Sequence, residues 1–177
     1  MAKIAFVGTF STGKTTLVHE IVFNLRKNGV DAEALEEIAR KCPFPINEKA
    51  IQETQLWNIT YQISEELARE KKCEILVCDR SVLDSYAYHV HFFKRKQNWE
   101  PMLKEYMQTY KLLVRVPIRN GLLKPDGIRS VDPEFQKQMD FLIEKLLKKF
   151  KLNYSDFQED NTINEICKKY EKSYKSL

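Results

Sequence analysis

The segment Gly8-Thr9-Phe10-Ser11-Thr12-Gly13-Lys14-Thr15 has the pattern G-x-x-x-x-G-K-T. It follows the apolar run Ile4-Ala5-Phe6-Val7 and precedes an apolar periodicity that is typical of a helix. A buried strand, a glycine-rich turn and a helix N-terminus, in this order, form the context in which this pattern binds phosphate. The segment therefore predicts that the chain binds a nucleoside triphosphate together with Mg²⁺.

Each residue type in this segment has a physical reason. Gly8 and Gly13 permit backbone conformations and close approaches that a Cβ atom would block. Successive backbone N–H groups can then surround an anion at the positive end of the helix. Lys14 is expected to reach the β- and γ-phosphates, and the Thr15 hydroxyl is expected to join the Mg²⁺ shell. The predicted nucleotide-binding residues are Gly8, Ser11, Thr12, Gly13, Lys14, Thr15 and Thr16.

Length and composition favour one globular domain over residues 1–177, with 43% hydrophobic and 31% charged residues. The net charge of +4 is mild and the lysines are scattered, so a nucleic-acid partner is not indicated. No apolar stretch has the length of a membrane span. The four cysteines form no C-x-x-C pair, and no histidines have zinc spacing, which favours a reducing, cytoplasmic location.

Hydrophobic patterns alternate between strand and helix periods along the chain. Helices separate most of the strands, which predicts βαβ units and a parallel sheet whose ligands lie at the carboxyl ends of the strands. In the longest helical pattern, the expected buried stripe is Ile51, Leu56, Ile59, Ile63 and Leu67. We expect strands at residues 3–7, 31–37, 74–79, 111–116 and 152–157, and helices at 14–28, 48–72, 82–93, 99–108, 133 to about 150, and about 162–174.

Acidic and basic side chains follow the second predicted strand, in Glu36-Glu37-Ile38-Ala39-Arg40. A carboxylate beside the phosphate-binding loop can act as a general base on an acceptor hydroxyl or hold Mg²⁺ through water. An arginine there can pair with phosphate. Glu37 is the preferred candidate over Glu36. The alternative is a surface ion pair at the strand end.

The third predicted strand ends in Cys78-Asp79-Arg80-Ser81. An acid at the end of the strand next to the phosphate-binding loop often lies near Mg²⁺. Asp79 fits that position, so Thr15 and Asp79 are the predicted metal-associated residues. Arg80 is then expected to point where an acceptor or the transferred phosphate would lie.

The segment 117–132 contains prolines, glycines and basic residues and is expected to be a loop. Long loops in compact domains are often functional, so we interpret it as a lid that delivers an arginine to the transferred phosphoryl group. Arg129 is the first candidate, with Arg119 and Lys124 nearby in the sequence. The alternative is a solvated connector.

Two aromatic groups have structural as well as functional interpretations. Trp57 could stack on an acceptor base while Gln52 or Gln55 binds its edge, but core or interface packing is an equal alternative for Trp57. The group Tyr86, Tyr88, His89, His91, Phe92 and Phe93 is expected to pack a helix.

The motifs resemble the P-loop nucleoside and nucleotide kinase group. Residues 79–88, D-R-S-V-L-D-S-Y-A-Y, resemble the D-R-[YH]-x-x-S-x-x-A-Y motif of thymidylate kinases, with departures at Ser81 and Asp84, and also the E-R-S motif of deoxynucleoside kinases. Glu37-Ile38-Ala39-Arg40 is similar to the E-Y-A-R of the ATPase-like domain in NadR-type ribosylnicotinamide kinases. Asp126-Gly127-Ile128-Arg129-Ser130 is similar to the D-G-x-R of that domain.

This resemblance implies the nucleoside monophosphate kinase fold, a three-layer α/β/α structure with a five-stranded parallel sheet in the order 2-3-1-4-5. It also implies a lid after the fourth strand, adenine contacts from residues 157–161, and a homodimer. The expected function is Mg²⁺-dependent transfer of the γ-phosphoryl group of ATP to a nucleoside, nucleotide or nucleoside-like acceptor. The alternative is a regulatory module that binds or hydrolyses NTP. The catalytic candidates are Lys14, Glu37, Asp79, Arg80 and Arg129.

Overall fold

Five parallel strands form one sheet in the order β2-β3-β1-β4-β5, which confirms the predicted fold. This computed structural model describes residues 1–124 and 130–170. Apolar residues of β1 and β3 are buried on both faces, as expected for central parallel strands. The strands are β1 (Ala2–Val7), β2 (Ala32–Leu35), β3 (Ile75–Asp79), β4 (Leu112–Arg115) and β5 (Ser155–Asp156).

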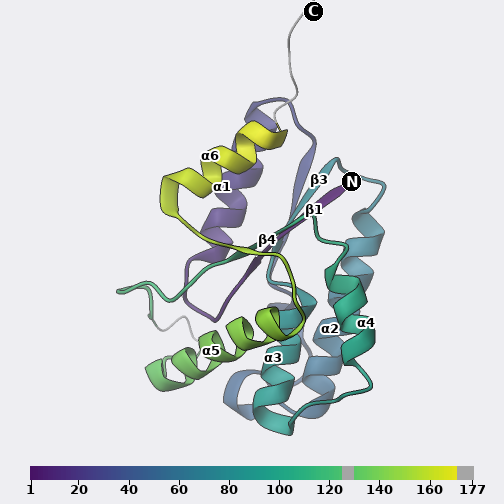
Figure 1. Cartoon of the computed structure of the whole chain (residues 1–177), viewed down its shortest axis with the longest axis vertical. Coiled ribbons are helices and arrows are strands. Elements are labelled where there is room, and N and C mark those ends of the chain that lie inside the picture. The colour runs from purple at the N-terminus through teal and green to yellow at the C-terminus, as the bar shows by residue number, and fades with distance from the viewer. Residues whose placement is uncertain (125–129, 171–177) are drawn as a thin grey trace, which may run out of the picture.

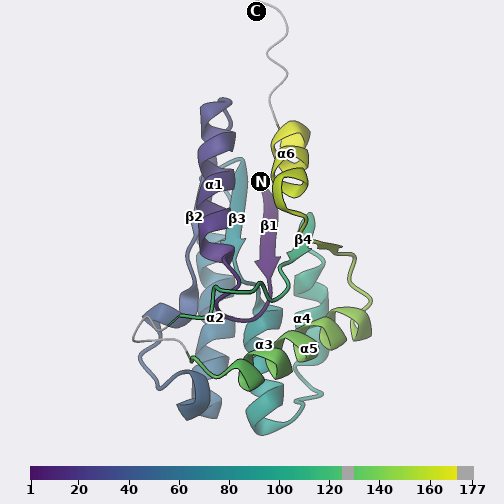
Figure 2. The same cartoon turned by 90° about the vertical axis from the view of Figure 1, so that its left-hand side faces the viewer.

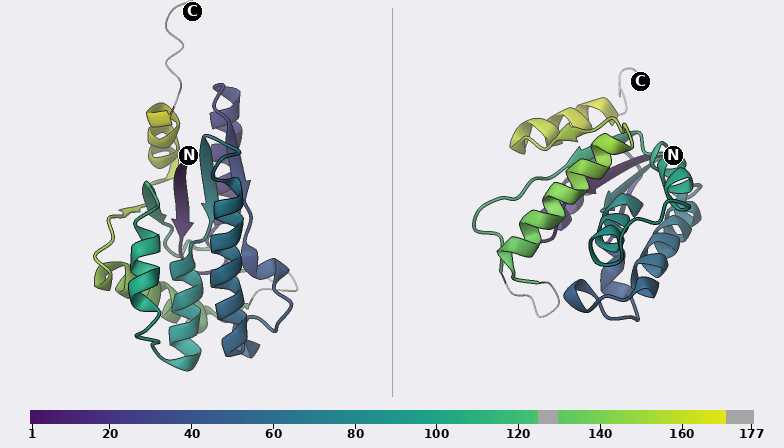
Figure 3. Two further views of the ribbon diagram at one scale, coloured as in Figure 1. Left: turned by 90° about the vertical axis from the view of Figure 1, so that its right-hand side faces the viewer. Right: turned by 60° about the horizontal axis from the view of Figure 1, so that its bottom comes forward.

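Helices cover both faces of the sheet, giving three layers (Figure 1, Figure 2). On one face lie α1 (Lys14–Lys27) and α6 (Glu159–Tyr170). Figure 3 shows helices of the other face side by side. That face is covered by α2 (Gln52–Arg69), α3 (Val82–Phe93), α4 (Glu100–Met107) and α5 (Pro133–Lys149). Two short 3₁₀ helices, η1 (Ile38–Lys41) and η2 (Asn47–Lys49), lie between β2 and α2.

Several element ends differ from the expectation. The strand predicted at 31–37 ends at Leu35, so both Glu36 and Glu37 lie beyond it. The helix predicted from residue 48 begins at Gln52, because Ile51 is extended and its N–H bonds to the Thr54 hydroxyl. The strand predicted at 152–157 is only Ser155–Asp156, which is exposed at the sheet edge. The last helix begins at Glu159 rather than near residue 162.

The predicted buried stripe of the long helix was wrong for most of its members. Ile59 is buried, but Leu56 and Leu67 are 46% and 55% exposed. The helix instead buries a largely polar face, consisting of Thr54, Gln55, Asn58, Ile59, Gln62 and Glu66. This face is polar because one end lines a cleft beside the phosphate-binding loop and the other holds a buried carboxylate.

That carboxylate belongs to Glu66, which has no exposed surface. It accepts hydrogen bonds from Lys3 Nζ at 3.0 Å, Tyr106 OH at 2.8 Å and Tyr110 OH at 2.6 Å. Gln62 donates a further bond at 2.8 Å. The partners satisfy a charge that would otherwise be costly to bury. The network ties α2 to β1 and to the end of α4.

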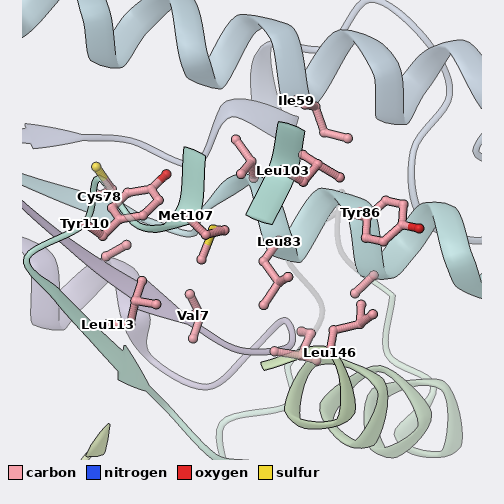
Figure 4. Close-up of a cluster of buried hydrophobic side chains, with 14 of the residues drawn as sticks. Val7, Ile59, Cys78, Leu83, Tyr86, Leu103, Met107, Tyr110, Leu113 and Leu146 are labelled. Atoms are coloured by element: carbon pink, nitrogen blue, oxygen red, sulfur yellow. The ribbon is translucent and has the colours of Figure 1, made fainter. Parts of the chain in front are cut away.

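The main apolar core lies between the sheet and α2–α5, and α3 runs through its centre (Figure 4). Leu83 and Tyr86 of α3 pack among side chains from α2, α4, β4 and α5. The aromatic residues of α3 pack within this core and against Phe135 of α5, as expected for helix packing. Trp57 and Tyr61 stack on each other with ring centroids 4.6 Å apart.

Because α3 lies in the core, truncating its buried side chains should greatly lower the free energy of unfolding. Leu83→Ala should lower the free energy of unfolding by about 2–5 kcal/mol, because it removes apolar contacts and leaves a cavity. The matched control is Leu67→Ala on the exposed face of α2, which should change it by about 0.5 kcal/mol or less. Urea unfolding of both variants checks the prediction, and equal costs would contradict this assignment of the core.

Candidate functional site

The phosphate-binding loop lies at the carboxyl end of β1 and leads into α1. Gly8 has φ +148°, and a Cβ atom there would lie 2.5 Å from the carbonyl oxygen of Val116. Gly13 caps α1 with φ +88°, a left-handed conformation that residues with a Cβ atom adopt only with strain. Both positions therefore require glycine, as predicted from the sequence.

The Lys14 side chain folds inward over this loop. Its ammonium donates to the carbonyl oxygen of Thr9 and, at 3.0 Å, to the Thr12 hydroxyl. Burial, assisted by the positive charge of Arg80, lowers the pKa of Lys14 to about 8, although the nearby carboxylates oppose this. A polyphosphate in the loop would supply the negative charge that this buried ammonium favours. The loop encloses a small cavity, whose lining includes Ser11, Thr12 and Gly13. Thr16, by contrast, is exposed on the first turn of α1.

Thr15 and Asp79 meet at the floor of the loop, where the Thr15 hydroxyl donates to Asp79 Oδ2 at 2.5 Å. Burial raises the pKa of Asp79, although the Lys14 ammonium opposes this increase. A hydroxyl and a carboxylate oxygen suit Mg²⁺, which commonly takes one or two protein ligands and completes its shell with phosphates and water. The two residues therefore fit the predicted metal role. The described residues contain no cluster of three or more His, Cys, Asp or Glu side chains suited to a metal.

Arg80 and Glu37 form a buried ion pair with Arg80 Nε 2.7 Å from Glu37 Oε1. The Arg80 backbone has φ +83°, a strained conformation for a non-glycine residue, and its N–H bonds to the Phe6 carbonyl oxygen at 3.0 Å. Burial alone would lower the pKa of Arg80, but Glu37 and other negative groups raise it above its usual value. Arg40 also contacts Glu37, at 3.3 Å. The site therefore holds a permanently charged guanidinium.

The structure separates the two candidate acids after β2. Glu37 is 7% exposed and faces Arg80, whereas the Glu36 side chain is 52% exposed and pairs with His19 at 3.0 Å. The sequence does not fix which of the two faces the loop, because adjacent residues differ only in the direction of their side chains. In the structure, the side chain that lines the loop cavity belongs to Glu37, the preferred candidate, and its catalytic role stays a prediction.

Two cavities adjoin at this ion pair. The cavity within the phosphate-binding loop is lined by residues 10–15, Glu37, Asp79 and Arg80. A second cleft, open to solvent, lies beside it, and Phe10, Glu37 and Arg80 line both spaces. A group bound in the cleft would therefore approach a phosphate in the loop at Glu37 and Arg80.

Amide side chains of α2 form part of the cleft wall. Gln55 and Asn58 are each 3% exposed, and Asn58 Nδ2 lies 3.5 Å from Gln55 Oε1. Asn58 Oδ1 has no hydrogen-bond partner among the described residues. Of these two residues, the sequence analysis named Gln55 but not Asn58. It also did not identify Phe10 and Tyr88 as cleft residues. Trp57, which it proposed for base stacking, is not part of the lining. The spacing of Gln55, Asn58 and Gln62 on one helix face was the available signal.

The described ends of the segment 117–132 contact the loop and its surroundings. Arg119 Nε donates to the Thr12 carbonyl oxygen at 3.2 Å, and its guanidinium lies 5.7 Å from the centre of the Phe157 ring. Ser130 donates to Glu48 of η2. Arg129 and the rest of 125–129 lie outside the described residues, so the role of Arg129 stays a prediction.

Comparisons with known proteins bear on the family and the fold. A family model described as an AAA domain matches residues 3–164. No curated protein sequence is significantly similar to the chain. None of the helices in the described part combines the length and apolar character that a membrane crossing requires.

Solved structures with the same fold include a deoxyadenosine kinase from M. mycoides with bound dATP. The two chains are 19% identical, the match covers 96% of this chain and 98% of the kinase chain, and the TM-score is 0.64. A NadR protein in complex with NR is 18% identical with a TM-score of 0.73, over 96% of this chain and 51% of that protein. At these identities the likeness establishes the P-loop kinase fold, whereas the features specific to thymidylate kinases and the homodimer stay predictions.

The buried ion pair gives a prediction about stability. Glu37→Gln should lower the free energy of unfolding by roughly 2–4 kcal/mol, because the Arg80 charge would lose its buried counter-ion. Glu36→Gln is the adjacent control and should change it by about 0.5 kcal/mol or less. Chemical unfolding of both variants at neutral pH measures the difference. A larger effect at Glu36 would reverse the assignment.

Proposed function

The chain belongs to the AAA domain family, and we propose that it is a phosphotransferase that moves the γ-phosphoryl group of ATP to a hydroxyl of a nucleoside or nucleoside-like acceptor. One observation carries this proposal. The loop cavity and the second cleft share Glu37 and Arg80, so a donor phosphate and an acceptor hydroxyl could meet there. An NTPase that uses only water has no need of a separate cleft of this kind.

Each residue at the junction has a role in this scheme. The loop amides and Lys14 bind the polyphosphate, and Glu37 accepts the proton as the acceptor oxygen attacks the γ-phosphorus. The bond from the γ-phosphorus to the bridging oxygen breaks, and ADP leaves. Arg80 stabilises negative charge on the transferring group. Mg²⁺ held near Thr15 and Asp79 would neutralise charge on the phosphates.

The charges of the cleft favour an acceptor without a phosphate. Within residues 1–124 and 130–170, its charged lining residues are Glu37, Arg40 and Arg80, and both arginines pair with the one carboxylate. A phosphate on the acceptor would compete for these cations with Glu37 and, at Arg80, also with the transferring phosphoryl group. The amides of Gln55 and Asn58 can instead donate to and accept from the polar edge of a neutral base or carboxamide. A nucleoside or a nucleoside-like compound matches this lining best.

The function is tested by supplying Mg²⁺-ATP, and separately Mg²⁺-GTP, with pooled deoxynucleosides, nucleoside monophosphates and nicotinamide riboside. Mass spectrometry should detect a new phosphorylated product whose mass names the acceptor. Release of free phosphate alone would contradict the proposal and favour the regulatory NTP-binding alternative.

Lys14→Ala is the matched negative control for this assay. It should abolish product formation, because the polyphosphate would lose its only loop lysine. The same rate in the variant and the unmodified chain would rule out the assigned phosphate site.

The pKa of Lys14 predicts a pH dependence. The free chain loses the Lys14 charge as pH rises through about 8, so kcat/KM for Mg²⁺-ATP should fall above that pH. Bound phosphates raise the pKa of Lys14, so the alkaline decline of kcat should occur at higher pH. Steady-state kinetics between about pH 6 and 10 measure both profiles. A constant kcat/KM through pH 9.5 would contradict the role of Lys14.

A further inference from the structure

Asp84 is a fully buried acid of α3 that none of the roles above uses. Its Oδ2 accepts hydrogen bonds from the N–H of Ser81 at 2.8 Å and from the Ser81 hydroxyl at 2.9 Å. These bonds close the N-terminal cap of the helix. Its Oδ1 accepts a different bond, from the N–H of Gly8 at 2.9 Å. One carboxylate thus joins two segments that are far apart in the sequence.

The bond to Gly8 is not explained by helix capping. Gly8 is the first residue of the phosphate-binding loop, where the carbonyl group of Val116 leaves no room for a Cβ atom. The Gly8 N–H is buried and would cost free energy if it were left without a partner. The carboxylate of Asp84 supplies that partner and fixes the start of the loop.

Arg80 depends on the same arrangement. Its guanidinium Nη1 lies 3.4 Å from the carbonyl oxygen of Gly8, and its strained backbone leads directly into Ser81. Gly8 therefore contacts Asp84 through its N–H group and Arg80 through its carbonyl group. A shift of Asp84 would move the loop and the guanidinium relative to each other.

We propose that Asp84 is a positioning residue, which holds the phosphate-binding loop and the Arg80 guanidinium in register across the point of phosphoryl transfer. This inference rests on the proposed function. Asp84 does not face either cavity, so it acts through Gly8 and Ser81 rather than by touching substrate. Misplacement of transfer groups by about 1 Å can reduce a rate on the order of 10²-fold.

The test is Asp84→Asn, which keeps the size of the side chain but can no longer accept with both of its terminal atoms. We expect kcat to fall by about tenfold or more, while KM for ATP and for the acceptor changes by less than about threefold. Asp84→Ala should lower kcat further and also lower stability. If folded Asp84→Asn kept kcat within about twofold of the unmodified chain, the inference would be wrong.

The matched control is Glu66→Gln, since Glu66 is equally buried and also accepts several hydrogen bonds, but lies away from both cavities. It should lower the melting temperature while kcat per folded molecule stays within about twofold. A proportional loss of stability and kcat in both variants would mean that Asp84 is only structural.

The product assay on the unmodified chain distinguishes failure of the proposed function from failure of this inference. If the unmodified chain produced no phosphorylated acceptor, the proposed function would be wrong, whatever the role of Asp84. The comparison of Asp84→Asn with Glu66→Gln would then use phosphate release from Mg²⁺-ATP, in which water replaces the acceptor. A selective loss in Asp84→Asn would support the positioning role, and equal rates would overturn it.

Discussion

The buried contact between Arg80 and Glu37 constrains most of the candidate site. Two charges with little exposure remain stable there only because each has close partners. The contact ties the end of β3 to the segment after β2. Arg80 has a positive φ, a strained backbone conformation that persists only where surrounding contacts fix it. It also lies where the loop cavity meets the cleft. The same pair thus lines both cavities of the candidate site.

In the proposed function, two tasks are divided along one edge of the parallel sheet. The loop after β1 would bind the polyphosphate through its amides, Lys14 and Thr15, in the usual position for this fold. The helix α2 would provide a polar wall for the acceptor, and the segment after β2 would provide a carboxylate between donor and acceptor. Burial of polar side chains on α2 is costly unless they are satisfied. Asn58 Oδ1 is a buried atom of this wall that has no partner among the described residues.

Much of the fold and of the phosphate-binding loop could be predicted from the sequence, because apolar runs, glycine positions and helix periodicity agree along the first part of the chain. The apolar runs of β1 and β3 and the glycine pattern of residues 8–15 predict two strands and the loop without knowledge of distant contacts. The sheet order was instead an expectation from the resemblance to P-loop kinases, and the structure has that order. The predicted buried stripe of α2 was wrong because we assumed that its apolar side chains face the core. Leu56 and Leu67 instead face outward, and polar residues of the helix are buried. Asp84 was noted only as a departure from a motif. Its bond to Gly8 joins residues that no local pattern connects.

In the proposed reaction, donor and acceptor meet at Glu37 and Arg80. The affinity of linked compounds measures this meeting directly: ATP is joined through its γ-phosphate to the primary hydroxyl of deoxyadenosine, deoxycytidine, thymidine or nicotinamide riboside. If the two cavities adjoin as described, calorimetry should find at least one compound that binds about 10²-fold more tightly than ATP, since the second contact becomes intramolecular. Affinities no greater than that of ATP for all four compounds would contradict the account.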